Sequence, residues 1–552
     1  MTATGVLLGS ASPLWLPPVT ALCVGGLILL ARRAVRLAQN LCLVVALVAA
    51  VEITGSNHAL DHALPTRGWP VMMHLPADIF GAPTAWSLSA PSVTIIIFVL
   101  IAFLFSLSWL VAARPGSKTL FWLVLEFASI WGIATATNLP TIFICTQLLI
   151  VPQYFLNLGA GLAHSRRIAR RMLASSIVIN GCILAAILAS YSPLTATMPT
   201  AGNAAPSIAF VFIILAIWLS LSLFPFHSVQ NARMTIDGQN LLPLNSNLWT
   251  GLALMLWMEH STLAPSLHDA ALWLAVLGGT AMGACSVACF AQRELSRSMA
   301  YAASAISAFA FLAWLAQGML GVVGAVLILG VLPVTIFGFQ RGIDLLFLQA
   351  RDITVLSDNP AAPRGAAHLL FLLLTAACVG MPATAVFRGV WFALVGMILT
   401  TTTTGHVNWQ TVFLGFFTLS ALMPMILGVI SRSLLAFRDP AQNIRRPDIN
   451  VYAVNTGTGP DANFTAPLNL DAYVRTARRW AIWAMLVSLT LGIFPTLAVG
   501  PLLNSLSLPR KQAVPPPMNP LPFHQPHTVI VEWMPSGGRP RPADDITGGS
   551  YP

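Results

Sequence analysis

Residues 319–340 read MLGVVGAVLILGVLPVTIFGFQ, an apolar run of 22 residues without a charged side chain. A helix of that length is about 33 Å long, slightly more than the hydrocarbon core of a bilayer. Apolar residues make up 56% of the 552-residue chain, charged residues only 8%, and the mean hydropathy is +0.77. Soluble domains carry roughly 25% charged residues. The composition therefore predicts a polytopic membrane protein.

Apolar runs of similar length recur along the chain and predict fourteen membrane spans. They lie near 14–31, 38–55, 88–113, 119–137, 140–160, 172–191, 207–225, 243–259, 271–291, 299–315, 319–340, 366–398, 409–431 and 480–499. We expect helices, because every backbone polar group must be satisfied internally in lipid. The run near 14–31 has no basic residue before it and three arginines soon after it, which favours an outside N-terminus over a cleavable signal peptide.

The basic residues support this span count. With the N-terminus outside, the connections expected inside hold 22 of the 28 lysines and arginines. Short inside connections are enriched in Lys and Arg. The pattern therefore predicts an integral protein of a bacterial-type inner (cytoplasmic) membrane with both termini on the outer face. The basic excess reflects topology, and we do not expect nucleic-acid binding.

Neither a metal site nor a cofactor site is predicted on this chain. All seven cysteines lie in or beside apolar runs and no CxxC occurs. Cys285 and Cys289 share a helical face, but they lack a third ligand nearby, which favours packing. The outer loop 56–87 contains three histidines, but their spacing is irregular for a metal site. Neither a GxGxxG nor a Walker loop is present.

Four short stretches occur in a distinctive order. They are 138–156 (NLPTIFICTQLLIVPQYFL), 223–228 (LFPFHS), 292–301 (QRELSRSMAY) and 380–382 (GMP). With the fourteen-span layout, they resemble the antiporter-like subunits of respiratory complex I, NADH:quinone oxidoreductase. The resemblance runs from about 90 to 500 and is greatest to subunit M, which is chain 4 in the mitochondrial enzyme.

The resemblance implies an all-α fold with two inverted five-helix repeats, each containing a broken helix that lines a hydrated half-channel. Pro225 and Pro382 lie where those breaks are expected, because a proline leaves one helix carbonyl without its partner. The expected organisation, given as residue ranges, is N-terminal helices 1–113, first repeat 119–259, second repeat 271–437, inner segment and last helix 438–500, and a proline-rich tail 501–552.

The residues that carry protons in the resembled family are replaced in this chain. The resemblance places Gln147 at the fifth-span glutamate, Ser220 and Ser296 at two lysines, Met319 at a histidine, and Val390 (two residues after Arg388) at the twelfth-span glutamate. The chain has only two lysines, Lys118 and Lys511, and neither lies in a predicted span. Since a pump needs groups that take up and release protons, we expect proton conduction by this subunit to be reduced or lost.

A few titratable residues remain near the membrane. His227 lies in the family-like LFPFHS stretch, and histidine titrates near neutral pH, so it either carries protons or bonds the broken backbone. Glu126 lies within the fourth span, where it could act in a proton path, pair with Arg388, or stay neutral. The other such residues are Glu52, Glu259 and Asp344.

Two classes of function are therefore open. The resemblance implies a non-redox subunit in the membrane arm of a complex I-type enzyme, without a catalytic centre of its own, surrounded by other membrane-arm subunits and lipid. The alternative is an antiporter-like subunit of another assembly, such as a cation antiporter, a membrane hydrogenase or an inorganic-carbon uptake complex.

Overall fold

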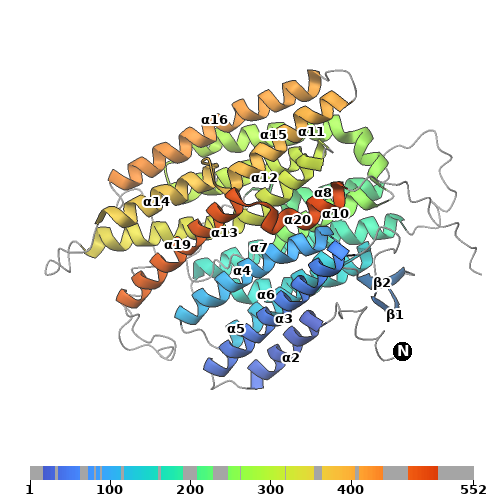
Figure 1. Cartoon of the computed structure of the whole chain (residues 1–552), viewed down its shortest axis with the longest axis horizontal. Coiled ribbons are helices and arrows are strands. Elements are labelled where there is room, and N and C mark those ends of the chain that lie inside the picture. The colour runs from blue at the N-terminus through green and yellow to red at the C-terminus, as the bar shows by residue number, and fades with distance from the viewer. Residues whose placement is uncertain are drawn as a thin grey trace, which may run out of the picture. The chain divides into compact units, whose positions relative to one another are not determined.

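The computed structural model forms two units, Met1–Ser507 and Leu508–Pro552, and the described residues all belong to the first (Figure 1). They are 16–30, 35–62, 73–79, 82–86, 90–113, 117–158, 163–190, 208–227, 246–261, 263–316, 319–352, 364–403, 409–438 and 470–507. Most of the tail predicted from 501 lies outside these residues.

Helices occupy every predicted span, so the helical membrane fold is confirmed. The first half contains α2 (Leu16–Leu30), α3 (Val35–His62), α4 (Ala90–Ala113), α5 (Ser117–Thr135), α6 (Leu139–Leu158), α7 (Ala163–Ser190), α8 (Ile208–Ser220) and α10 (Ser246–His260). The second half contains α11 (Ala264–Ala291), α12 (Leu295–Leu315), α13 (Met319–Asp352), α14 (Arg364–Val379), α15 (Ala385–Thr403), α16 (Trp409–Arg438), α19 (Leu470–Ile493) and α20 (Thr496–Ser507).

Several helices continue beyond the apolar runs that predicted them. By length and composition, six of the described helices have a stretch long and apolar enough to cross a membrane, and seven have shorter apolar stretches. Helix α7 begins at Ala163, before the predicted 172, and α13 ends at Asp352, beyond the predicted 340. An apolar run marks the bilayer core alone, and helices extend past it into the polar interface.

One element was not predicted. Within the segment 56–87, predicted as an outer loop, α3 continues to His62 and is followed by an antiparallel hairpin of β1 (Met73–Ile79) and β2 (Ala82–Trp86); Trp86 also bridges to Ala136 at the end of α5. Each strand includes a proline, which is depleted in strands, so composition gave no strand signal. The hairpin is an addition to an otherwise helical fold.

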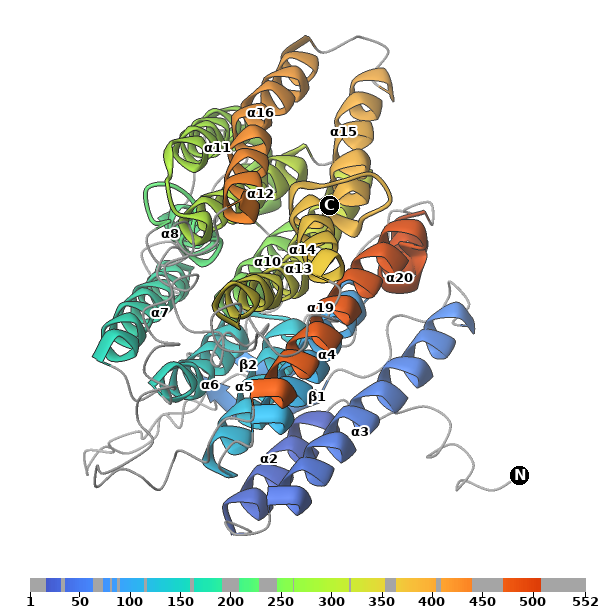
Figure 2. The same cartoon turned by 90° about the vertical axis from the view of Figure 1, so that its left-hand side faces the viewer.

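Helix α13 lies at the centre of the first unit and packs against helices from both halves, including α4, α12, α14, α15 and α19. In both views α2 and α3 lie on one side of it and α16 on the other (Figures 1 and 2). Helices α13 and α15 approach closely because glycines meet there: a methyl group on Gly324 would lie 2.6 Å from the carbonyl oxygen of Gly389. Small residues allow such backbone contacts between membrane helices.

In each of the two predicted repeats, the first helix contacts the last. Helix α5, the first of the first repeat, contacts α10, its last helix, and α11 contacts α16 in the same way in the second repeat. In the order of the described helices, α8 is the fourth element from α5, and α14–α15 is the fourth from α11.

Candidate functional site

Helix α8 ends in a defined backbone motif. Its last residue is Ser220, and Ser222 has a positive φ of 55°. The N–H of Leu223 donates to the carbonyl of Trp218 (3.2 Å), and that of Ser222 donates to Leu219 (3.1 Å). This pair of bonds around a left-handed residue is a Schellman motif. The motif satisfies two of the helix's last carbonyls and stops the helix inside the protein.

Helix α14 ends in the same motif. It ends at Val379, and Gly380 has a φ of 90°. The N–H of Met381 donates to the carbonyl of Ala376 (2.8 Å), and that of Gly380 donates to Ala377 (3.3 Å). The two halves therefore stop their broken helices with the same hydrogen-bond pattern, once at a serine and once at a glycine.

The predicted break residues Pro225 and Pro382 both follow these motifs in the chain. Each is exposed, and each comes after the left-handed residue that ends its helix. Since proline disfavours the helical conformation of the residue before it, each proline opposes continuation of the helix. The chain resumes helical structure at Ala385 after the second break, where α15 begins.

His227 and Ser220 lie on either side of the first break. The His227 ring is half-buried and stacked on Phe224, with 5.4 Å between centroids, and its centroid is 4.9 Å from that of Tyr301 on α12. His227 therefore contacts the second half of the protein. Ser220 is only 1% exposed and lies against α10, where a methyl group on Gly251 would be 3.1 Å from its Cβ.

The remaining predicted residues are spread over the fold. Arg388 is half-buried on α15, with its guanidinium carbon 5.6 Å from the centre of the Phe392 ring. Glu126 is 2% exposed on α5, and among the described residues it makes no ion pair with Arg388. Gln147 is exposed on α6, and Ser296 is half-buried in the first turn of α12. Within the described chain, no two of the six candidate residues form a hydrogen bond or ion pair with each other.

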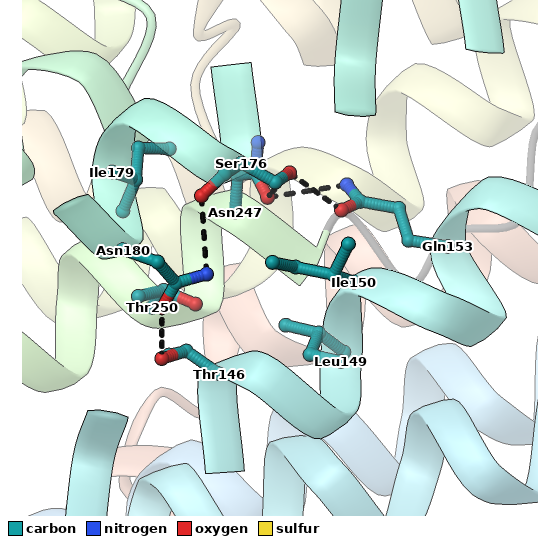
Figure 3. A pocket seen from close by; sticks show the side chains of 9 residues that line it. All are labelled: Thr146, Leu149, Ile150, Gln153, Ser176, Ile179, Asn180, Asn247 and Thr250. Atoms are coloured by element: carbon teal, nitrogen blue, oxygen red, sulfur yellow. Dashed lines mark hydrogen bonds between the residues drawn. The ribbon is translucent and has the colours of Figure 1, made fainter. Parts of the chain in front are cut away.

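A different set of polar side chains does converge, between α6, α7 and α10 (Figure 3). The Gln153 amide donates to the Asn247 oxygen (3.1 Å) and accepts from the Ser176 hydroxyl (2.8 Å). The Asn180 amide donates to the Ser176 carbonyl (3.1 Å), and the Thr146 hydroxyl donates to the Asn180 oxygen. We refer to these five residues as the neutral cluster. Its hydrogen bonds join three helices.

The neutral cluster lies in the protein interior. Its five side chains are each 3% or 4% exposed. They line a cavity with Leu149, Ile150 and Ile179 that offers about 10 Å³ to the centre of a water molecule, the lower limit for holding one. The Asn247 nitrogen is buried in this setting without a hydrogen-bond partner among the described residues. The cluster therefore retains one unused donor and space for about one small acceptor.

The chemistry of the neutral cluster suits structure better than proton transfer. Amides and hydroxyls exchange hydrogen bonds, but they do not gain or lose a proton at neutral pH. Polar side chains that bond across membrane helices stabilise their association. The cluster can therefore fix α6, α7 and α10 against each other and position a water molecule. It cannot store a proton as a buried lysine–carboxylate pair does.

The five cluster residues were not among the sequence-based candidates, although the sequence contained a signal for them. Ser176 and Asn180 are four residues apart on α7, and Thr146 and Gln153 are seven apart on α6, so each pair lies on one helical face. Polar residues repeated on one face of an apolar span indicate a protein-facing side. The resemblance directed attention to Gln147 instead.

This protein resembles known proteins in structure, and the sequence comparisons found no match. No protein-family model matches the sequence, and no curated protein matches it. A chain of the Mrp complex from Dietzia sp. DQ12-45-1b superposes with a TM-score of 0.62 and 16% identity, over 89% of this chain and 52% of that one. The protein thus spans about half the length of that chain.

Two further solved structures match over nearly their whole length. A chain of respiratory complex I from Thermus thermophilus has a TM-score of 0.59 and 18% identity, over 89% of this chain and 98% of that one. A chain of the membrane-bound sulfane sulfur reductase, an archaeal respiratory membrane complex, has a TM-score of 0.59 and 12% identity, over 89% and 96% respectively. The protein is an integral membrane protein with the antiporter-like fold found in these multi-subunit complexes.

Proposed function

We propose that this chain is a membrane-arm subunit of a complex I-type NADH:quinone oxidoreductase, related to subunit M, whose own proton conduction is reduced or lost. The four ordered stretches of sequence support the choice of complex, and the fold likeness to a nearly full-length complex I chain supports an antiporter-like membrane subunit. Its partners are the other membrane-arm subunits and the lipid around them. It contributes scaffold or coupling, and the redox chemistry belongs to other subunits.

The observation that carries the reduced conduction is the neutral cluster. Three helices of the first repeat are joined there by hydrogen bonds between uncharged groups. The buried Ser220, which the resemblance places at a pump lysine, likewise cannot hold a proton for transfer. Protons could still cross along water near His227, but this route lacks the paired charges that drive a pump.

A second candidate function draws on the other two likenesses. The same fold occurs in an Mrp complex and in a membrane-bound sulfane sulfur reductase, so the chain could serve a cation antiporter, a membrane hydrogenase or an inorganic-carbon uptake complex. In each of these the chain is again a membrane subunit among several. The two candidates differ in the soluble partner to which the membrane part is attached.

Affinity purification of the tagged chain from native membranes, followed by mass spectrometry, separates the candidates. Co-purification of an NADH-oxidising arm and sister antiporter-like subunits is the expected result. Recovery of a different soluble module, without NADH-oxidising subunits, would favour the second candidate. Isolation of the chain alone from mild detergent would contradict both.

Proton conduction is tested separately in liposomes that contain the purified chain and a pH-sensitive dye. After an acid jump, we expect the interior to acidify no faster than in protein-free liposomes. A matched variant, His227→Ala, should then give the same trace. Rapid acidification by the unaltered chain that the histidine variant abolishes would show a conducting path and overturn the reduced-conduction part of the proposal.

A further inference from the structure

Gln147 is in an unusual position for an amide. It is the ninth of the 20 residues of α6, at least about 12 Å along the helix axis from either end, and so lies within the bilayer core. Its side chain is exposed and makes no hydrogen bond within the described part of the chain. Exposed apolar residues surround it on the same face, including Leu148, Val151 and Phe155.

The helix backbone beside Gln147 also lacks one of its usual hydrogen bonds. Pro152 lies inside α6 and has no N–H, so the carbonyl of Leu148 lacks its usual helical donor. The Leu148 side chain is 52% exposed. The Gln147 amide and a carbonyl that lacks its usual helical donor therefore occur within one turn, at mid-depth. Lipid tails offer no hydrogen bonds to either group, so exposing them to lipid is costly.

We propose that the exposed side of α6 binds a transmembrane helix of another subunit, which presents a neutral hydrogen-bonding side chain at mid-membrane depth. This exposed side is formed by Gln147, Leu148, Val151 and Phe155. A serine, threonine, asparagine or glutamine fits, because Gln147 both donates and accepts. A charged partner does not fit, because Gln147 cannot neutralise it. The apolar side chains around the amide supply the packing surface.

The proposal rests on the proposed function, which makes the chain one subunit of a membrane complex. It adds which face binds a neighbour and by what chemistry. Interhelical hydrogen bonds of this kind contribute modestly and specifically to the association of membrane helices. Loss of the Gln147 amide should therefore weaken one contact in the complex without unfolding the chain.

Photo-crosslinking within the intact complex tests the surface. A photoreactive phenylalanine derivative replaces Val151, one turn from Gln147, and native membranes are irradiated before solubilisation. The expected product is an adduct with a different membrane polypeptide, with the crosslinked peptide mapped to one of its apolar spans. Adducts with lipid alone, with a second copy of this chain, or within the chain itself would each overturn the proposal.

Variants test the hydrogen bond. In Gln147→Leu we expect about a threefold loss of the crosslinked partner from the detergent-washed complex, the effect of one interhelical hydrogen bond in a membrane. Gln147→Asn should retain more of the partner than the leucine variant. The matched control is Thr280→Val on α11: this threonine is also exposed in mid-span, but its hydroxyl already donates to its own Leu277 carbonyl (2.9 Å).

The control should recover the partner as the unaltered chain does. If Gln147→Leu and the unaltered chain recover equal amounts of the partner subunit, the proposed hydrogen bond at this surface is wrong. If the unaltered tagged chain brings down no other membrane polypeptide, the proposed function has failed as well. If partners co-purify but the Val151 position reaches none of them, this surface alone has failed.

Discussion

Replacing Gln153 with leucine tests whether the neutral cluster holds three helices together. The change keeps roughly the same volume, so it leaves no cavity. It removes the acceptor of the Ser176 hydroxyl (2.8 Å) and the donor to the Asn247 oxygen (3.1 Å). Both former partners stay buried, at 4% exposure each. The substitution therefore leaves each of these groups with one hydrogen bond fewer, while the longer bond from the Ser176 hydroxyl to the Asn247 oxygen (3.3 Å) remains.

The magnitude follows from two reference values. Hydrogen bonds between membrane helices contribute about 0.6 kcal/mol each on average, which gives about 1.2 kcal/mol for two. A buried polar group left without a partner costs about 1–3 kcal/mol in soluble proteins. The cavity at the cluster has room for about one water molecule, which can satisfy one of the two groups. We therefore expect Gln153→Leu to lower the free energy of unfolding by about 1–3 kcal/mol.

The assay is titration of the purified chain with sodium dodecyl sulfate in mixed micelles, followed by circular dichroism. The matched control is Gln147→Leu on the same helix, whose exposed side chain makes no hydrogen bond among the described residues, and it should change stability by less than about 0.5 kcal/mol. The double variant Gln153→Leu/Asn247→Leu should cost about 1 kcal/mol less than the sum of its single variants. Strict additivity, or a Gln153 variant as stable as the control, would refute the coupled cluster.

Three further outcomes are expected, all measured by the same titration. Ser222→Gly should raise the free energy of unfolding by about 0.5–1 kcal/mol, because glycine tolerates the φ of 55°. Gly380→Ala should lower it by about 1 kcal/mol, because alanine does not tolerate the φ of 90°. Changes of the opposite sign would contradict the left-handed helix ends. Gly324→Leu should lower the free energy of unfolding by about 3 kcal/mol, because even a methyl group would lie 2.6 Å from the Gly389 oxygen. A leucine variant as stable as the unaltered chain would disprove the close helix contact.

The helical membrane fold could be predicted because the bilayer sets a minimum apolar length, which runs such as 319–340 meet. The breaks were predicted at Pro225 and Pro382, but the helices end earlier, at left-handed residues. Gly380 is a typical residue for that conformation, whereas Ser222 is not, because a side chain usually opposes a positive φ. The first helix end therefore depends on its surroundings.

The rotation of α6 could not be predicted from its apolar pattern. In a membrane, both the lipid and the protein interior are apolar, so hydrophobic periodicity does not distinguish them. Gln147 and Gln153 are six residues apart, or about 240° around the helix, so both cannot face the interior. The resemblance favoured Gln147, whereas the structure buries Gln153 and exposes Gln147. Only the partners on α7 and α10 decide between them, and they are distant in sequence.

The absence of charge in the neutral cluster has an electrical consequence. A unit charge that moves across the full membrane potential changes energy by about 2.3 kcal/mol for every 100 mV, so a charged site at mid-membrane responds to voltage. The cluster has no net charge to move. The hydrogen bonds of its five residues should therefore hold α6, α7 and α10 together equally well in energised and de-energised membranes, because their strength does not depend on the membrane potential.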